Sequence, residues 1–107
     1  MKARPVAMLF IAAGLMAPGA ALAQDVADGQ RIAGAWCSGC HQVDEQKQNK
    51  GSDAVPSFPS IAQMNSTTQM SLIVFLSNSH NRMPDYSLSR TEVQNVSAYI
   101  LSLRKSR

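Results

Sequence analysis

The sequence predicts a small all-α domain, and three observations lead to this fold class. No stretch of the chain shows the alternating or β-branched runs that form strands. Apolar residues instead recur three and four positions apart in several stretches. A Ser or Thr followed three positions later by Glu or Gln precedes two of these stretches, which is typical of a helix N-terminus. With 107 residues, the chain holds one domain at most.

Residues 1–23 are typical of a secretory signal peptide. Lys2 and Arg4 precede an apolar run over residues 6–17, and Ala21-Leu22-Ala23 supplies the small residues of a cleavage site. The alternative is a retained membrane anchor, but the run is shorter than the roughly 20 residues that cross a hydrocarbon core. We therefore expect cleavage after this segment and export to the periplasm, as in a Gram-negative bacterium.

The mature domain, residues 24–107, is short and almost neutral. The chain has 10 Lys and Arg against 7 Asp and Glu, and the predicted signal peptide holds two of the basic residues, which leaves a net charge near +1. This balance argues against a nucleic-acid partner. Domains of this size often need a disulfide, metal or cofactor to complete the core. The domain contains only five aromatic residues, namely Trp36, Phe58, Phe75, Tyr86 and Tyr99. We expect a large flat ligand to join them.

The two cysteines identify that ligand. They stand in Cys37-Ser38-Gly39-Cys40-His41, the Cys-x-x-Cys-His arrangement of covalent c-type haem attachment. Two thiols three residues apart can reach the two vinyl groups of one porphyrin, and the histidine that follows is held beneath the iron. The motif therefore predicts one haem c, bound covalently by Cys37 and Cys40 and ligated by His41.

The motif has two alternative interpretations. A disulfide or thioredoxin-like redox pair belongs beside a βαβ pattern, which this chain does not show. A zinc site needs two further ligands, and His80 is the one other plausible nitrogen donor in the sequence.

The first helix is expected to start at a cap on Asp25 or Asp28 and to run through about Ser38. The haem motif then lies at a helix end. Spacings of three and four residues predict an inner face formed by Ile32, Ala33 and Trp36.

The middle of the domain is expected to hold a loop and a second helix. Residues 42–59 are polar and broken by glycine and proline, so they predict a loop, most mobile around residues 46–52. Ser66-Thr67-Thr68-Gln69 resembles a capping box that opens a helix through about Ser77. The face of this helix toward the macrocycle or the core is predicted to consist of Leu72, Ile73, Phe75 and Leu76.

The last helix has the clearest signals. Ser89 and Glu92 form a capping pair. One apolar stripe follows, made of Val93, Val96, Ile100 and Leu103. Basic residues favour the negative end of the helix dipole, and they follow here as Arg104, Lys105 and Arg107.

These features together resemble the class I c-type cytochromes of the small bacterial kind. The resemblance covers residues 24–107 and rests on the haem motif, on Pro56 within Val-Pro-Ser-Phe, on Met83-Pro84 and on the amphipathic last helix. It implies three to four helices wrapped around one haem.

The resemblance also implies particular contacts. The first and last helices should cross near Gly29 with Tyr99 at the contact, and the Pro56 carbonyl should accept the Nδ1 proton of His41. The aromatic residue that the family usually has four positions before the first cysteine is missing, because Ala33 stands there. We expect Trp36 to compensate for the missing aromatic ring by packing from an adjacent face.

Met83 is the predicted sixth ligand of the iron. It lies in a polar, turn-rich stretch where an apolar thioether needs a reason to point inward, and Pro84 stiffens the loop that would hold the sulfur. Three other Met or His residues remain as alternatives, as does an open coordination site; they are His80, Met64 and Met70.

The sequence predicts an electron carrier and no catalytic residues. It has no phosphate-binding glycine loop, no recognisable nucleophile-base pair and no second haem motif. We expect a periplasmic, monomeric one-electron carrier that exchanges electrons with redox protein partners. Two alternatives remain: an electron-accepting subunit of a periplasmic dehydrogenase or oxidase, and a gas-binding or sensor cytochrome with a labile distal ligand.

Overall fold

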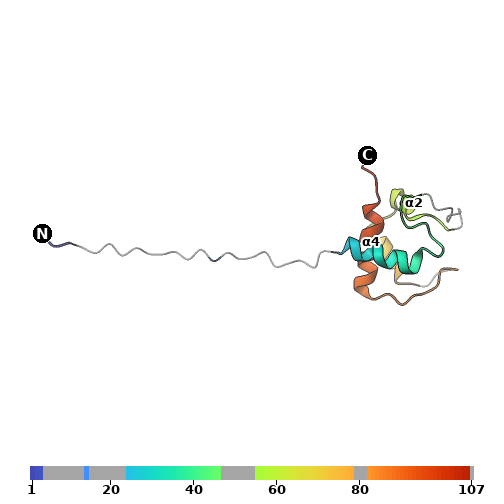
Figure 1. Ribbon diagram of the computed structural model, residues 1–107, viewed down its shortest axis with the longest axis horizontal. Helices are drawn as coiled ribbons and strands as arrows, with labels where there is room; N and C mark the ends of the chain where they lie inside the picture. The colour runs from blue at the N-terminus through green and yellow to red at the C-terminus, as the bar shows by residue number, and fades with distance from the viewer. Residues whose placement is uncertain (4–13, 15–23, 47–54, 79–81, 107) are drawn as a thin grey trace.

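The structure is a computed structural model that describes residues 1–3, 14, 24–46, 55–78 and 82–106 (Figure 1). Most of the predicted signal peptide falls outside these residues. So do the alternative ligand His80, the larger part of the loop expected to be most mobile, and Arg107.

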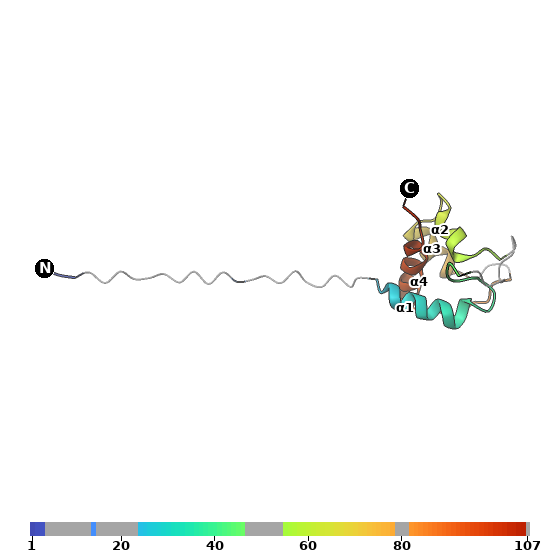
Figure 2. The same ribbon diagram turned by 45° about the horizontal axis from the view of Figure 1, so that its top comes forward.

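The all-α prediction is confirmed. The described residues form four α-helices and contain no β-strand beyond isolated bridge residues. The helices are α1 (Val26–Ile32), α2 (Phe58–Gln63), α3 (Gln69–Leu76) and α4 (Arg90–Ser102), and α1 continues directly into a π-helical turn, η1 (Ala33–Cys37). Helix α4 contacts each of the other three α-helices, and α1 lies across it (Figures 1 and 2).

Helix α1 begins where the sequence predicts, but its inner face differs at one position. Asp25 caps the helix by accepting a hydrogen bond from the backbone N–H of Asp28 at 2.9 Å. Ile32 and Ala33 are buried as expected, whereas the side chain of Trp36 is 53% exposed, so its assignment to the inner face is wrong. The cause is the π-helical turn, in which residues three apart no longer lie over one another. Cys37, not Trp36, continues the buried face.

The crossing of α1 and α4 at Gly29 is confirmed. A Cβ atom on Gly29 would lie 2.0 Å from the backbone oxygen of Asn95 and 2.9 Å from Cβ of Tyr99, so only glycine fits between the helices. Polar contacts close the same crossing: the Asp25 N–H donates to Asn95 Oδ1, and Asn95 Nδ2 donates to Asp28 Oδ2, each at 2.9 Å. The bond from Asn95, and then those from Arg31, hold the pKa of Asp28 below its usual value.

The capping pair of α4 is confirmed, and that of α3 is displaced by two residues. Ser89 and Glu92 exchange side-chain and backbone bonds as expected. In α3 the reciprocal pair is Thr68 with Ser71, not Ser66 with Gln69. The preceding Thr67 is buried, and its hydroxyl donates to the Ile61 carbonyl at 2.7 Å. The chain therefore enters the helix two residues later than predicted.

The faces of α3 and α4 follow the predicted stripes only in part. Val93, Val96 and Ile100 of α4 are buried, and Leu103 is partly buried at the C-cap. In α3, Leu72 is buried but Phe75 is 52% exposed.

The predicted loop over residues 42–59 ends earlier than expected. Ser57 caps α2 by accepting from the Ser60 N–H at 3.2 Å, and Pro59 lies in the first turn of the helix, where its missing N–H costs nothing. Proline here opens a helix instead of breaking one.

Arg104 has a structural role that the charge pattern did not predict. Its guanidinium donates to the Ala62 carbonyl at 2.7 Å and to the Thr67 carbonyl at 2.6 Å. The C-terminal end of the chain is thereby tied to the connection between α2 and α3.

Candidate functional site

The haem motif lies at the point where η1 ends. The backbone N–H groups of Cys40 and His41 both donate to the Cys37 carbonyl, at 3.2 and 2.9 Å, and so curl the five residues into a compact turn. Cys37 is buried and Cys40 is exposed, and both are free thiols. Burial raises the pKa of the Cys37 thiol. No disulfide joins the pair.

The imidazole of His41 is oriented by its neighbours. Nδ1 lies 2.7 Å from the Pro56 carbonyl oxygen, which can only accept, so Nδ1 carries the proton and donates. The contact implied by the family resemblance is therefore present. The ring also packs on Phe58, with 5.3 Å between ring centroids. A protonated Nδ1 leaves the Nε2 lone pair free to bind a metal, and the carbonyl partner fixes the orientation of the ring.

The segment after His41 is anchored to two helices. The Phe58 N–H donates to the Gln42 carbonyl at 2.8 Å, and the Tyr99 hydroxyl of α4 donates to the Val43 carbonyl at 2.6 Å. Phe58 and Tyr99 also face one another with 6.5 Å between ring centroids. Burial, with a smaller effect of Asp44, raises the pKa of Tyr99.

This support of the motif by Phe58 and Tyr99 was not predicted from the sequence. Phe58 stands two residues after Pro56 in the Val-Pro-Ser-Phe segment, so the expected contact of Pro56 with His41 also implies that Phe58 lies near the histidine. The bond from Tyr99 to Val43 joins residues 56 apart and leaves no local trace in the sequence.

Met83 lies in the irregular segment before α4. Its side chain is partly buried, whereas Met64 and Met70 are 51% and 68% exposed. A small cavity of about 20 Å³ separates this segment from the end of α3. It is lined by Leu76, Asn78, Met83, Pro84, Asp85, Tyr86 and Leu88.

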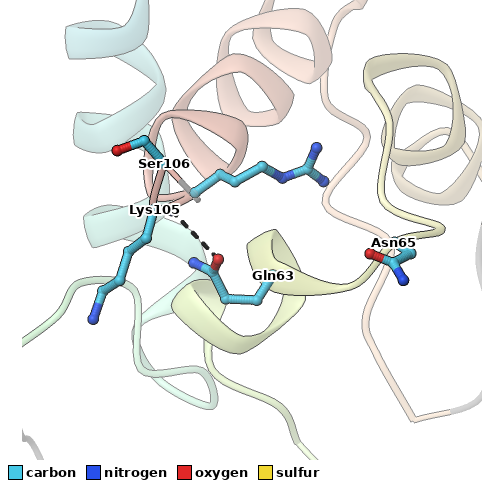
Figure 3. Close-up of a pocket in the computed structure, with 5 residues that line it drawn as sticks. Gln63, Asn65, Lys105 and Ser106 are labelled. Carbon is cyan, nitrogen blue, oxygen red and sulfur yellow. Dashed lines mark hydrogen bonds between the residues drawn. The ribbon is translucent and has the colours of Figure 1, made fainter.

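A second cavity, of about 550 Å³, lies between the end of α2 and the C-terminal residues (Figure 3). It is lined by Gln63, Asn65, Arg104, Lys105 and Ser106. The backbone N–H of Lys105 donates to Gln63 Oε1 at 3.3 Å across its edge. None of the four predicted haem-binding residues lines this cavity.

The donor set of the motif fits a c-type haem. Two free thiols stand three residues apart, and an imidazole with a free Nε2 follows directly. In the described ranges as a whole, no group of three or more His, Cys, Asp or Glu side chains is arranged to hold a metal ion by itself.

That the protein does not span a membrane after signal-peptide cleavage stays a prediction. Among the helices of the described residues, none is long and apolar enough to do so.

Comparison with known proteins agrees with the chemistry of this site. Residues 24–100 match the model of a family described as "Cytochrome C oxidase, cbb3-type, subunit III". The chain is also 42% identical over 84 residues to cytochrome c-552 of Bradyrhizobium diazoefficiens, an alignment that covers 78% of this chain and 80% of that protein. No solved structure matches the chain significantly.

Proposed function

Because the chain belongs to this family of class I c-type cytochromes, it is a haem c electron-transfer protein, and we propose that it is a monomeric one-electron carrier of the periplasm. It exchanges electrons with redox protein partners and converts no substrate. The signal-peptide pattern of residues 1–23 supports export. The mature protein is then residues 24–107.

The haem would be held by four side chains. Cys37 and Cys40 would form the thioether bonds, and His41 and Met83 would be the two protein ligands of the iron. The observation that carries this assignment is the 2.7 Å contact from His41 Nδ1 to the Pro56 carbonyl, since it presents Nε2 as the ligand. When bound, the haem supplies the one-electron couple of its iron. The partial burial of Met83, against the exposure of Met64 and Met70, supports Met83 as the sulfur ligand.

Covalent attachment is tested by mass spectrometry of the protein purified from its native compartment. We expect the mass of residues 24–107 plus one haem. Cys37→Ser and Cys40→Ser should each weaken maturation, since one thioether bond is lost. Colour that extracts freely into acidified organic solvent would contradict covalent attachment.

Axial ligation is tested by the weak near-infrared sulfur-to-iron band of the ferric protein. Met83→Ala should abolish the band and open the iron to carbon monoxide, whereas Met64→Ala and Met70→Ala should leave the band intact. Retention of the band in Met83→Ala would move the ligand to another methionine. Ready binding of carbon monoxide by the unaltered protein would favour the gas-binding alternative.

A second candidate function follows from the description of the matched family as an oxidase subunit. In this case the chain accepts or passes electrons as part of a larger enzyme. Gel filtration of the protein from its native source separates the two: elution as a single chain supports the free carrier, and stable co-elution with a catalytic subunit supports the second candidate.

A further inference from the structure

Two aromatic side chains meet on the surface beside the proposed haem ligands. The rings of Trp36 and Tyr86 lie 5.6 Å apart between centroids and are tilted by 43°, within the range of favourable aromatic pairs. The two side chains remain 53% and 44% exposed. Their contact is therefore not part of the core, and each ring covers the other from solvent.

The contact joins the two segments that carry the proposed ligands. Trp36 lies in η1 and directly precedes Cys37, the first residue of the haem motif. Tyr86 lies three residues after Met83, and both line the same small cavity. The pair thus links two segments whose contacting residues are 50 positions apart in the sequence. They are the haem-attachment segment, residues 33–41, and the Met83 segment, residues 82–89.

The Met83 segment needs such support. Residues 84–89 have no regular secondary structure, and Ser87 adopts a left-handed backbone conformation with φ 51°. Its N–H donates to Asp85 Oδ1 at 2.8 Å, which is a contact within the segment itself. A non-glycine residue in this conformation costs on the order of 1 kcal/mol and persists only where surrounding contacts hold it.

We propose that the Trp36–Tyr86 pair is a clasp that holds the Met83 segment against the haem-attachment segment and so keeps competing ligands from displacing the Met83 sulfur. The inference rests on the proposed ligation by Met83. Trp36 and Tyr86 are positioning residues, because they act through Met83 and not on the iron. The clasp has to open before the sulfur can be displaced. The strength of the Trp36–Tyr86 contact therefore sets the fraction of molecules that can bind a competing ligand.

The test is a titration of the ferric holoprotein with imidazole, followed by loss of the near-infrared sulfur band. Trp36→Leu and Tyr86→Leu should each lower the midpoint concentration of imidazole about two- to tenfold, the range expected for loss of one aromatic pair. The double variant should shift no further than either single variant, because both break the same contact. Tyr86→Phe keeps the ring and should match the unaltered protein. Met70→Leu, at an exposed position on α3, is the surface control.

The same titration in the Met83→Ala variant distinguishes the clasp from simple shielding of the haem by the two rings. In Met83→Ala no sulfur has to be displaced, so Tyr86→Leu should leave imidazole binding unchanged there, as followed in the haem absorption band. An equal increase of imidazole affinity in both backgrounds would mean that the rings only block access, and it would overturn the clasp.

A different result would refute the proposed ligation of the iron by Met83. Retention of the sulfur band in Met83→Ala refutes Met83 as the ligand and the clasp with it. Unchanged midpoints in both leucine variants, with the band lost in Met83→Ala, refute the clasp alone.

Discussion

Tyr99 shows how one side chain serves both the core and the site. Its ring packs between the α1 crossing and Phe58, and its hydroxyl donates to the Val43 carbonyl at 2.6 Å, two residues after the haem-motif histidine. The hydroxyl therefore links the position of His41 to α4. An aromatic ring in a core is common, and the buried phenol hydroxyl is satisfied here because it has an acceptor.

Tyr99→Phe should lower the free energy of unfolding by about 0.5 to 1.5 kcal/mol at neutral pH, since it removes one hydrogen bond and no apolar area. Denaturant titration of the holoprotein measures this loss. Because the pKa of Tyr99 is raised in the folded protein, its contribution is fully present below the ordinary tyrosine pKa of 10.0 and is lost as the pH rises through the higher folded value.

The stability difference between the two proteins should accordingly narrow in alkaline solution. A difference that stays constant from pH 8 to pH 11 would show that the phenol proton is not bound more tightly in the folded state.

The crossing of α1 and α4 is the contact between elements on which the fold most depends. The two helices approach at Gly29 closely enough that a Cβ atom there would overlap the Asn95 carbonyl. Asn95 then uses its side chain to hold the start of α1 through Asp25 and Asp28. The closest approach of the two backbones and the hydrogen bonds between the two helices therefore occur at the same place.

Gly29→Ala should destabilise the protein by about 1 to 3 kcal/mol or more, because the two backbones must separate. Gly34→Ala is a matched control in the next turn, where a Cβ atom meets nothing within 4 Å. Alanine there should be neutral or stabilise by up to about 1 kcal/mol. Thermal unfolding of both variants decides the matter, and equal melting temperatures would refute the tight crossing.

Arg104, which follows α4, bonds to α2 and to the turn between α2 and α3. Arg104→Met keeps most of the aliphatic stem but removes the donors to the Ala62 and Thr67 carbonyls, so we expect a loss of about 1 to 3 kcal/mol in the free energy of unfolding. Lys105→Met removes a neighbouring exposed charge and should change stability by less than about 0.5 kcal/mol. Similar effects of the two substitutions would indicate that charge alone matters at this end of the chain.

On the scale of the whole molecule, charge and core size have separate consequences. The proposed mature domain, residues 24–107, would have a net charge near +1 before the two haem propionates are added, so it would present no strong field to a partner. One of its cations, Arg104, is engaged with backbone carbonyls. Its core of buried apolar residues is small and includes Cys37 of the haem motif, which suggests that the apo-chain is much less stable than the holoprotein.

Electron transfer to a protein partner should depend only mildly on ionic strength. Strongly steered pairs lose tenfold or more in rate as salt is added, and we expect a smaller change here. Stopped-flow transfer rates across a salt series measure it. A steep fall in rate that Lys105→Gln abolishes would place the C-terminal charges in the docking surface.

Features carried by a few adjacent residues could be predicted from the sequence. The haem motif is contained in five residues, and the cap of α4 in four, because the chemistry of each depends on groups that one turn of backbone brings together. The all-α class followed for the same reason, since helices form from contacts three and four residues apart. The resemblance to a family added the crossing at Gly29 and the partner of His41, which local patterns do not contain.

Other features depended on tertiary packing. Trp36 lies outside the inner face because a π-helical turn changes the spacing of side chains along the helix. The residues of that turn do not predict a π-helix. The contacts of Arg104 with Ala62 and Thr67, of Tyr99 with Val43 and of Trp36 with Tyr86 join residues 37 to 56 positions apart. Such contacts form only after the helices have packed. The free energy that offsets the loss of side-chain freedom in these contacts comes from the whole core and not from adjacent residues in the chain.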